Sequence, residues 1–374
     1  MINREITHQI KDDLFKGKAI VITGPRRVGK TTLIKFIQES SGKETLFLNC
    51  DEADVRPMLE NATSTQLKFL IGNNTLVLID EAQRVKNIGI TLKLLVDNFK
   101  DVQVIASGSS ALELANEINE PLTGRKKEYH LFPISTNEMI NYSSALEEKR
   151  MLTQRMIYGF YPDIINNPDE ARESLFELST NYLYKDILSL ENVRKPALLE
   201  KLLIALAFQV GSEVSYQEIG QTIGSDPKTV ENYISLLEKC FVIFQLGSFS
   251  RNLRNEIKKG KKIYFYDNGI RNAIIKNFNP VELRQDVGAL WENYIISERF
   301  KANQYAKRYV NNYFWRTQAQ QEIDLIEEAG GKLCAYEFKW NEKIKTKIPA
   351  SFLSAYPESE GKIVNRDNYL EFVG

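Results

Sequence analysis

The feature that most constrains this chain is an eight-residue run that fits the pattern G-x-x-x-x-G-K-[ST]: Gly24-Pro25-Arg26-Arg27-Val28-Gly29-Lys30-Thr31. The uninterrupted apolar run from Ala19 to Thr23 precedes it, and apolar residues at helical spacing follow it as far as Ser40. In a strand, loop and helix of this kind, the glycines let successive backbone N–H groups face a phosphate, and the helix directs its positive end at the same charge. The run therefore predicts a nucleotide-binding loop.

Short apolar runs that alternate with helical spacing predict an α/β domain on a buried parallel sheet. The runs are Ala19 to Thr23, Thr45 to Asn49, Leu76 to Ile79 and Val102 to Ala106. Asp80 and Glu81 directly follow the third run, at the carboxyl end of a strand, where ligands of such sheets bind. We expect Lys30 to reach the outer phosphates of a nucleotide, and Thr31 and Asp80 to hold Mg²⁺. Glu81 is then placed to orient or activate the attacking water.

Three further residues are candidates for the same site. Thr32 is the last of the residues, 24–32, to which we assign phosphate contacts. Ser109 lies in the run Ser107-Gly108-Ser109-Ser110, which suits sensing of the γ-phosphate and equally suits a plain turn. Arg125 fits both an arginine finger, in cis or in trans, and a surface ion pair. The sequence has no Asn-Lys-x-Asp stretch for guanine, which favours ATP over GTP.

Prolines and changes in periodicity divide the 374 residues into five predicted parts. Residues 1–135 are the P-loop core, and residues 136–195, rich in Leu, Glu and Lys, are a helical lid or linker. Residues 196–250 read as three helices and a strand, with Asp226-Pro227 opening the third helix, and predict a winged helix-turn-helix. Residues 251–280 are a basic linker, and residues 281–374 are an α+β domain.

The C-terminal part contains two alternating runs joined at Gly330-Gly331, which is a two-residue hairpin signal. A hairpin centred there places Asp324 opposite Glu337 and Glu322 opposite Lys339. Because residues i and i+2 share a face, Asp324, Glu337 and Lys339 converge on one side of the sheet. Opposed like charges are destabilising unless something offsets them, and a divalent metal would do so.

The P-loop run, the Leu78 to Gln83 segment Leu-Ile-Asp-Glu-Ala-Gln, the Gly108 to Ser110 run and the Leu131-Phe132-Pro133-Ile134 segment resemble the AAA-type ATPases of bacteria and archaea. The chain also resembles archaeal ATPases counted among the signalling ATPases of the STAND type. The resemblance covers nearly the whole chain. It implies an ATPase domain followed by a winged helix and a nuclease-like C-terminal domain, acting as a switch rather than a motor.

The spacing of Asp324, Glu337 and Lys339 is similar to the PD-(D/E)XK nuclease core, although Ile323 stands where that motif has proline. This resemblance implies that Asp324 and Glu337 bind Mg²⁺, with Glu292 from the preceding helix as a third acid, and that Lys339 positions water for phosphodiester hydrolysis. Two other interpretations stay open. The acids of an amphipathic hairpin are neutralised by Lys339, or a nuclease fold is kept as a docking module.

Charge decides little about partners, because 49 basic residues balance 49 acidic ones. The predicted recognition helix, Asp226 to Lys239, is slightly acidic, which favours an interdomain or protein-docking role for the winged helix over DNA binding. A basic run is the candidate DNA or RNA contact, or else a solvated loop: Arg251, Arg254, Lys258, Lys259, Lys261 and Lys262. A partner protein and a homo-oligomer, which Arg125 in trans would require, are further candidates.

No apolar run approaches the roughly 18 residues that span a bilayer, and the first eighteen residues hold no signal core. We therefore expect a cytoplasmic chain without a membrane partner. The sequence predicts a Mg²⁺-dependent ATP hydrolase that controls a winged helix and a nuclease-like region acting on DNA. The alternative is an ATP-dependent regulatory switch or scaffold whose nuclease fold is inactive and docks a protein or nucleic acid.

Overall fold

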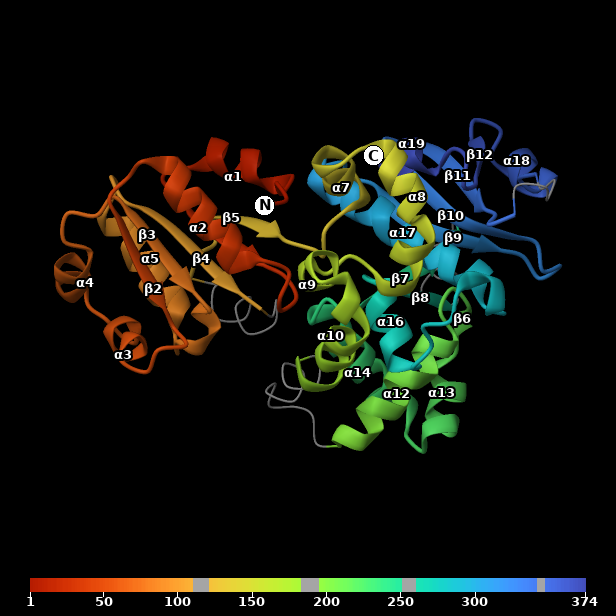
Figure 1. The fold of residues 1–374 in the computed structure, drawn as a ribbon, viewed down its shortest axis with the longest axis horizontal. Coiled ribbons are helices and arrows are strands. Elements are labelled where there is room, and N and C mark those ends of the chain that lie inside the picture. The colour runs from red at the N-terminus through yellow and green to blue at the C-terminus, as the bar shows by residue number, and fades with distance from the viewer. Residues whose placement is uncertain (110–120, 183–194, 251–259, 342–346) are drawn as a thin grey trace. The chain divides into compact units, whose positions relative to one another are not determined.

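The computed structural model describes residues 1–109, 121–182, 195–250, 260–341 and 347–374 (Figure 1). The chain forms two compact units, one containing Met1–Pro133 and the other most of Ile134–Gly374. Ser110 and four of the predicted nucleic-acid contacts, Arg251, Arg254, Lys258 and Lys259, lie outside the described residues. Within the described ranges, no helix has the length and apolar character needed to cross a bilayer.

The first unit is built on a five-stranded parallel sheet with the order β2-β3-β4-β1-β5. Its strands are β1 (Ala19–Thr23), β2 (Thr45–Asn49), β3 (Leu76–Asp80), β4 (Gln103–Gly108) and β5 (Lys126–His130). The four predicted strands are confirmed, and β5 was missed. The sequence of β5, Lys-Lys-Glu-Tyr-His, is polar because the strand is at an edge of the sheet and most of its side chains are only partly buried.

Helices cover both faces of this sheet, as its continuously apolar strands require. They are α1 (Ile6–Asp13), α2 (Lys30–Ser41), α3 (Val55–Leu59), α4 (Ser64–Ile71), the 3-10 turn η1 (Ala82–Arg84) and α5 (Ile88–Asn98). Helix α2 packs on β3 and β4, and α1 packs on α2 and β5. Alternate strand residues such as Val21, Val77 and Val104 instead form one core with α3, α4 and α5. Because β4 lies between β3 and β1, the ends of these three strands meet at one edge.

The second unit begins with helices where the sequence predicts them. They are α7 (Thr136–Tyr142), α8 (Ala145–Tyr158), α9 (Pro162–Asn166), η2 (Pro168–Glu170), α10 (Ala171–Glu177), the π-helical η3 (Leu178–Tyr182), α12 (Pro196–Phe208), α13 (Tyr216–Ile223) and α14 (Pro227–Lys239). Further along lie α16 (Asn268–Ile274), η4 (Val281–Leu283), α17 (Val287–Tyr305), α18 (Ala350–Ala355) and α19 (Tyr369–Val373). Asp226 accepts hydrogen bonds from Thr229 N and Oγ1 at 2.9 and 2.6 Å and so starts α14.

A single seven-stranded sheet runs through the second unit in the order β12-β11-β10-β9-β7-β8-β6. Its strands are β6 (Glu213–Val214), β7 (Ile243–Ser248), β8 (Lys261–Phe265), β9 (Asn311–Arg316), β10 (Glu322–Ala329), β11 (Lys332–Phe338) and β12 (Glu360–Val364). The short antiparallel set β6-β8-β7 joins the C-terminal strands through β7 and β9, which pair in parallel. Residues 261–274, placed by the sequence in a linker, therefore form β8 and α16. The predicted domain limits stay predictions. The seven-stranded sheet includes strands on both sides of the predicted limits at residues 250 and 280.

The predicted hairpin register is confirmed in β10 and β11 from Leu325 opposite Tyr336 to Ala329 opposite Lys332. Gly330 and Gly331 form the tip with φ of +57° and +80°, values that glycine adopts without strain. Helix α17 packs against β8 and β11 of this sheet (Figure 1). This helix and these strands therefore position the predicted C-terminal site.

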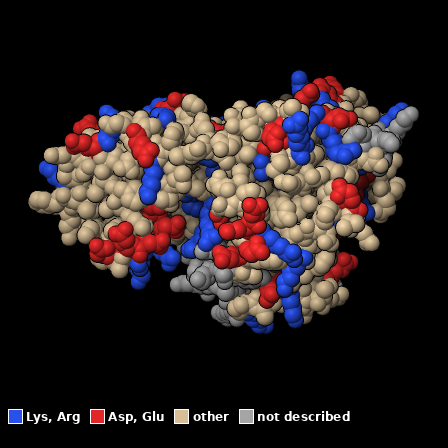
Figure 2. Space-filling view, in the orientation of Figure 1, with Lys and Arg blue, Asp and Glu red and all other residues tan. Residues whose placement is uncertain are grey.

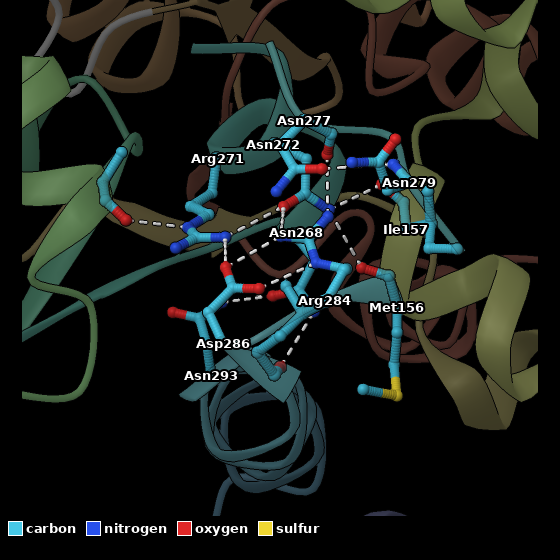
Figure 3. Close-up of polar contacts among 12 residues, drawn as sticks. Met156, Ile157, Asn268, Arg271, Asn272, Asn277, Asn279, Arg284, Asp286 and Asn293 are labelled. Atoms are coloured by element: carbon cyan, nitrogen blue, oxygen red, sulfur yellow. Dashed lines mark hydrogen bonds and ion pairs between the residues drawn. The ribbon is translucent and has the colours of Figure 1, made fainter. Parts of the chain in front are cut away.

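A buried polar network fixes the start of α17 (Figure 3). Asp286 accepts hydrogen bonds from Arg271 Nη1 at 2.5 Å and from Arg284 Nε at 2.9 Å, and both arginine side chains are almost fully buried. Two guanidinium groups on one carboxylate hold the pKa of Asp286 at about 2 despite its partial burial. Asn272 extends the network to the backbone of α8 by donating to Met156 O and Ile157 O at 3.2 and 2.8 Å.

Candidate nucleotide site and C-terminal acidic cluster

The loop between β1 and α2 has a backbone that only glycine permits at two positions. Gly29, the residue before α2, has φ +95°. A Cβ atom on Gly24 would lie 2.1 Å from the backbone oxygen of Leu131, which leaves no room for any side chain. The two glycines of the motif are therefore required by the shape of the loop and its packing.

Lys30, the first residue of α2, is 95% buried, and its ammonium donates to Gly24 O at 2.9 Å and to Pro25 O at 2.8 Å. The charge is thus held against the loop by carbonyl dipoles. An incoming phosphate would exchange these neutral acceptors for anionic oxygens, which make stronger hydrogen bonds with an ammonium. Of the other predicted contacts, Val28 is buried, Arg26 is partly buried, and Arg27 and Thr32 are exposed.

Asp80 is 96% buried at the end of β3, and its carboxylate accepts three hydrogen bonds from described residues. Thr31 Oγ1 donates to its Oδ2 at 2.6 Å, Ser107 Oγ donates to its Oδ1, and the Glu81 backbone N–H donates to Oδ1 at 3.1 Å. The hydroxyl of Thr31 and the carboxylate of Asp80 are hard oxygen ligands that touch one another next to the loop. This pair fits a Mg²⁺ ion that keeps most of its water shell.

Glu81 follows Asp80 with φ +52° and ψ +42°, a left-handed conformation that costs a residue with a Cβ about 1 kcal/mol or more. Gln83 holds its carboxylate, because Gln83 Nε2 donates to Glu81 Oε2 at 2.5 Å and to Ser109 Oγ at 3.1 Å. The structure thus brings Glu81 and Ser109 together through Gln83. Sequence reasoning included Gln83 in a motif but gave it no role.

Arg4 is the residue of the loop's surroundings that sequence reasoning missed. Its guanidinium is 92% buried and donates from Nη1 to Val28 O at 2.7 Å and from Nη2 to Phe132 O at 2.6 Å. One planar cation therefore joins the phosphate loop to the segment after β5. No sequence pattern reveals this contact, because Arg4 is separated from Val28 by 24 positions and from Phe132 by 128.

Arg125 is not brought to the loop within one copy of the chain. Its carbonyl accepts from Ala19 N at 2.9 Å, at the amino end of β1, whereas the loop follows the carboxyl end of that strand. Its Nε donates to Asp97 Oδ1 at 2.8 Å, and this ion pair lowers the pKa of Asp97. Of the two alternatives for Arg125, the structure contains the surface ion pair. A role as an arginine finger in trans stays a prediction.

The C-terminal acidic cluster contains the three residues that the hairpin predicts to converge. Lys339 Nζ lies 2.8 Å from Glu337 Oε2 and 3.9 Å from Asp324 Oδ2. Asp324 Oδ2 also accepts the Phe338 backbone N–H at 2.8 Å. Asp324 and Glu337 are both more than 90% buried, so their charges are held by neighbouring residues rather than by bulk water.

Glu292 of α17 reaches the same cluster but is held by a second lysine. Lys262 Nζ lies 3.1 Å from Glu292 Oε1 and also pairs with Glu322, while Tyr264 OH donates to Glu292 Oε1 at 2.6 Å. Lys262 is 98% buried in β8. Its predicted role as a nucleic-acid contact is therefore wrong, because a buried ammonium paired with two carboxylates cannot meet a phosphate backbone.

Burial perturbs these acids. It raises the pKa of Glu292 to about 7, helped by the charge of Asp324 and opposed by Lys262 and Tyr264. It likewise raises the pKa of Glu337 to about 7, again with Asp324 adding to it and Lys339 opposing it. Burial also raises the pKa of Asp324, against the charges of Lys262 and Lys339. Burial thus opposes the ionised form of all three acids, and the two lysines partly offset it.

The fit of a metal ion differs between the two sites. In the C-terminal cluster the described residues form no group of three or more His, Cys, Asp or Glu side chains arranged to hold a metal. Lys262 and Lys339 instead contact the carboxylates of Glu292, Glu337 and Asp324. As described, this arrangement does not fit the predicted three-acid metal site.

Comparison with known families divides the chain in three. Residues 16–140 match the family described as "AAA domain", residues 149–281 match "Domain of unknown function (DUF8612)", and residues 287–371 match "Domain of unknown function (DUF4143)". With the parallel sheet and the glycine loop, the first match defines a P-loop domain of the AAA type. The chain thus combines an AAA-type P-loop domain with a C-terminal domain of unknown function.

Similar proteins occur in distant organisms. Uncharacterised proteins of Mycobacterium tuberculosis and Mycobacterium bovis are each 25% identical over 344 residues, covering 90% of this chain and 73% of theirs. One from Haemophilus influenzae is 25% identical, covering 71% of each chain. Among solved structures, Bacteroides Pif1 bound to ssDNA has a TM-score of 0.25 at 21% identity, covering 41% of this chain and 49% of that one. Drosophila ORC bound to AT-rich DNA and Cdc6 has 0.29 at 12% identity, covering 73% and 90%.

Proposed function

We propose that the first unit binds ATP with Mg²⁺ and hydrolyses it slowly. The observation that carries the proposal is the 2.6 Å contact between Thr31 Oγ1 and Asp80 Oδ2 beside the glycine loop. It joins the hydroxyl at the start of α2 to the acid at the end of β3. In the sheet, β3 is two positions from β1, the strand that precedes the loop. The match of residues 16–140 to the AAA domain supports the same conclusion.

Each residue of the site has a proposed task. The backbone N–H groups of residues 24–32, except Pro25, which has none, bind the phosphates together with the start of α2. Lys30 moves from the carbonyls of Gly24 and Pro25 to the outer phosphates. Thr31 and Asp80 hold Mg²⁺, which when bound neutralises phosphate charge. Glu81 orients and deprotonates the attacking water after the contact with Gln83 opens, and Ser109 contacts the γ-phosphate or that water.

The proposal is tested by equilibrium binding of a fluorescent ATP analogue to the full chain. Lys30→Ala removes the only lysine of the loop and should weaken binding at least tenfold. Lys35→Ala, on the exposed side of the same helix, is the matched control and should bind as the wild type does. Unchanged affinity of Lys30→Ala would show that the loop is not the nucleotide site.

For the second unit, we propose a docking module whose availability depends on the nucleotide state. The order of α12, β6, α13, α14, β7 and β8 supports the predicted winged helix, and the slightly acidic α14 favours a protein partner. On the face that Figure 2 shows, basic and acidic side chains lie interspersed. Lys261 stays a proposed nucleic-acid contact, because its side chain is partly exposed. Its Nζ lies 6.0 Å from the centroid of the Tyr216 ring.

Metal-dependent hydrolysis of nucleic acid is the competing hypothesis for the second unit, because Asp324, Glu337 and Lys339 share one cluster. The built-in lysine counter-charges favour docking over hydrolysis. Incubating labelled single- and double-stranded DNA and RNA with the chain, Mg²⁺ or Mn²⁺, and with or without ATP separates the two. Cleavage by the wild type that Asp324→Asn abolishes would establish hydrolysis and refute the docking proposal.

A further inference from the structure

The C-terminal acidic cluster gathers four carboxylates, those of Glu292, Glu322, Asp324 and Glu337, around two ammonium groups. We propose that the Lys262 ammonium is the cation for which this cluster is built, and that it excludes a divalent metal from the position between Glu292 and the β10 acids. This inference concerns the chemistry of the second unit and does not depend on ATP binding by the first.

The position of Lys262 is fixed by its strand. β8 is paired on both sides, so that Lys262 lies opposite Leu246 of β7 and opposite Glu213 of β6. Its side chain is 2% exposed, and its Nζ lies 5.6 Å from the centroid of the Phe314 ring. A lysine on a strand that is paired on both sides, with its side chain buried, has no solvated position to which it can swing when a metal approaches.

The Oε1 atom of Glu292 has little remaining capacity for a metal. An oxygen of an ionised carboxylate offers about two lone-pair sites, and Glu292 Oε1 accepts from both Lys262 and Tyr264. Gly211 also lies close to this carboxylate, because a Cβ atom on Gly211 would be 3.4 Å from the carboxyl atoms of Glu292. A divalent ion would have to displace the lysine or the tyrosine to bind Glu292 through Oε1.

Lys339 plays the equivalent part at the other end of the cluster, where it contacts Glu337 and Asp324. It differs from Lys262 in that its side chain is 28% exposed, so it can move into solvent. Lys262 is therefore the residue whose loss leaves buried acids without an internal cation. Buried carboxylates in that condition either take up protons or bind a metal.

The test uses the full chain without nucleotide and Mn²⁺ as the probe. Isothermal calorimetry and the Mn²⁺ EPR signal measure binding to the wild type, Lys262→Met, Lys262→Arg and each of these with Asp324→Asn. The wild type and Lys262→Arg, which keeps the charge, should have no Mn²⁺ site that depends on Asp324. Lys262→Met should bind Mn²⁺ at least tenfold more tightly, and Asp324→Asn should remove the gain.

Two results would overturn the inference. One is a Mn²⁺ site in the wild type that disappears in Asp324→Asn, because the acids would then hold a metal beside Lys262; this measurement does not require any Lys262 variant to fold. The other is a folded Lys262→Met that binds Mn²⁺ no better than the wild type. If Lys262→Met melts at a lower temperature, Mn²⁺ should raise its melting temperature while leaving that of Lys262→Arg unchanged.

Discussion

The two acidic sites of this chain differ in what holds their carboxylates. Asp80 accepts hydrogen bonds from two hydroxyls and a backbone amide, and the nearby lysine of the loop is bonded to carbonyls. Glu292, Asp324 and Glu337 are bonded or paired to lysines. Hydroxyls are neutral and readily become metal ligands themselves, whereas an ammonium is repelled by a metal. A site with neutral donors is therefore open to Mg²⁺, and one with built-in ammonium groups is already neutralised.

The largest expected effect sharpens this contrast through ATP turnover. Glu81→Gln should retain ATP binding and lower the turnover rate by about 10²–10⁴-fold, the usual contribution of a general base. Glu337→Gln changes an equivalent group in the second unit and should leave turnover within about twofold of the wild type. Steady-state phosphate release at saturating ATP measures both. A Glu81→Gln variant with normal turnover would remove Glu81 from its proposed role.

A smaller effect is expected from Arg4, which positions the loop without belonging to its motif. Arg4→Met leaves the carbonyls of Val28 and Phe132 without their charged donor, and each loss costs about 1–3 kcal/mol. If part of that cost falls on the loop's binding-ready shape, the Kd for ATP rises about tenfold for each 1.4 kcal/mol. Fluorescence titration of the folded variant measures the Kd.

Arg155→Met is the matched control for Arg4→Met, because Arg155 forms a buried pair with Glu148 at 2.8 Å within the second unit. It should lower the melting temperature and leave the Kd for ATP unchanged. Arg4→Lys keeps the charge and should recover part of the affinity. Equal Kd values for Arg4→Met and the wild type would reduce Arg4 to a purely structural role.

The smallest effect is expected from Arg125→Ala. The ion pair with Asp97 is exposed, and such pairs contribute little to stability, so the melting temperature should hardly change. In dilute protein the turnover rate should also stay the same, because Arg125 lies at the opposite end of β1 from the loop. A loss of turnover that appears only as the protein concentration rises would indicate a contact in trans. A loss at every concentration would contradict the placement of Arg125.

Much of the first unit was predictable because its signals are local. A buried parallel strand needs an apolar run, and a phosphate loop needs glycines at fixed spacing, so Ala19 to Thr23 and Gly24 to Thr31 predict their own structure. The sequence did not predict β5, because an edge strand with partly exposed side chains does not need an apolar run. The hairpin register of β10 and β11 was also predictable, since two glycines at a tip fix every pair beyond it.

The partners of the charged residues were not predictable in the same way. Lys262 stands among basic residues in the sequence and reads as a solvated contact, yet β8 carries it into the sheet against Glu292 and Glu322. The sequence suggests that Arg125 is a loop residue near the nucleotide. In the structure it lies at the amino end of β1, whereas the nucleotide loop follows the carboxyl end. In both cases the decisive neighbour is distant in the chain, at Glu292 and Ala19 respectively.

The sequence by itself determined the loop, the two acids at the end of β3 and the turn of the C-terminal hairpin, because each depends on backbone geometry within a few residues. The tertiary structure alone decided which charge neutralises which. Electrostatic pairing depends on distance in space and on burial, and a single chain order is compatible with many such pairings. Arg4 on the phosphate loop, Gln83 beside Glu81 and Lys262 in the acidic cluster are residues whose role only the fold assigned.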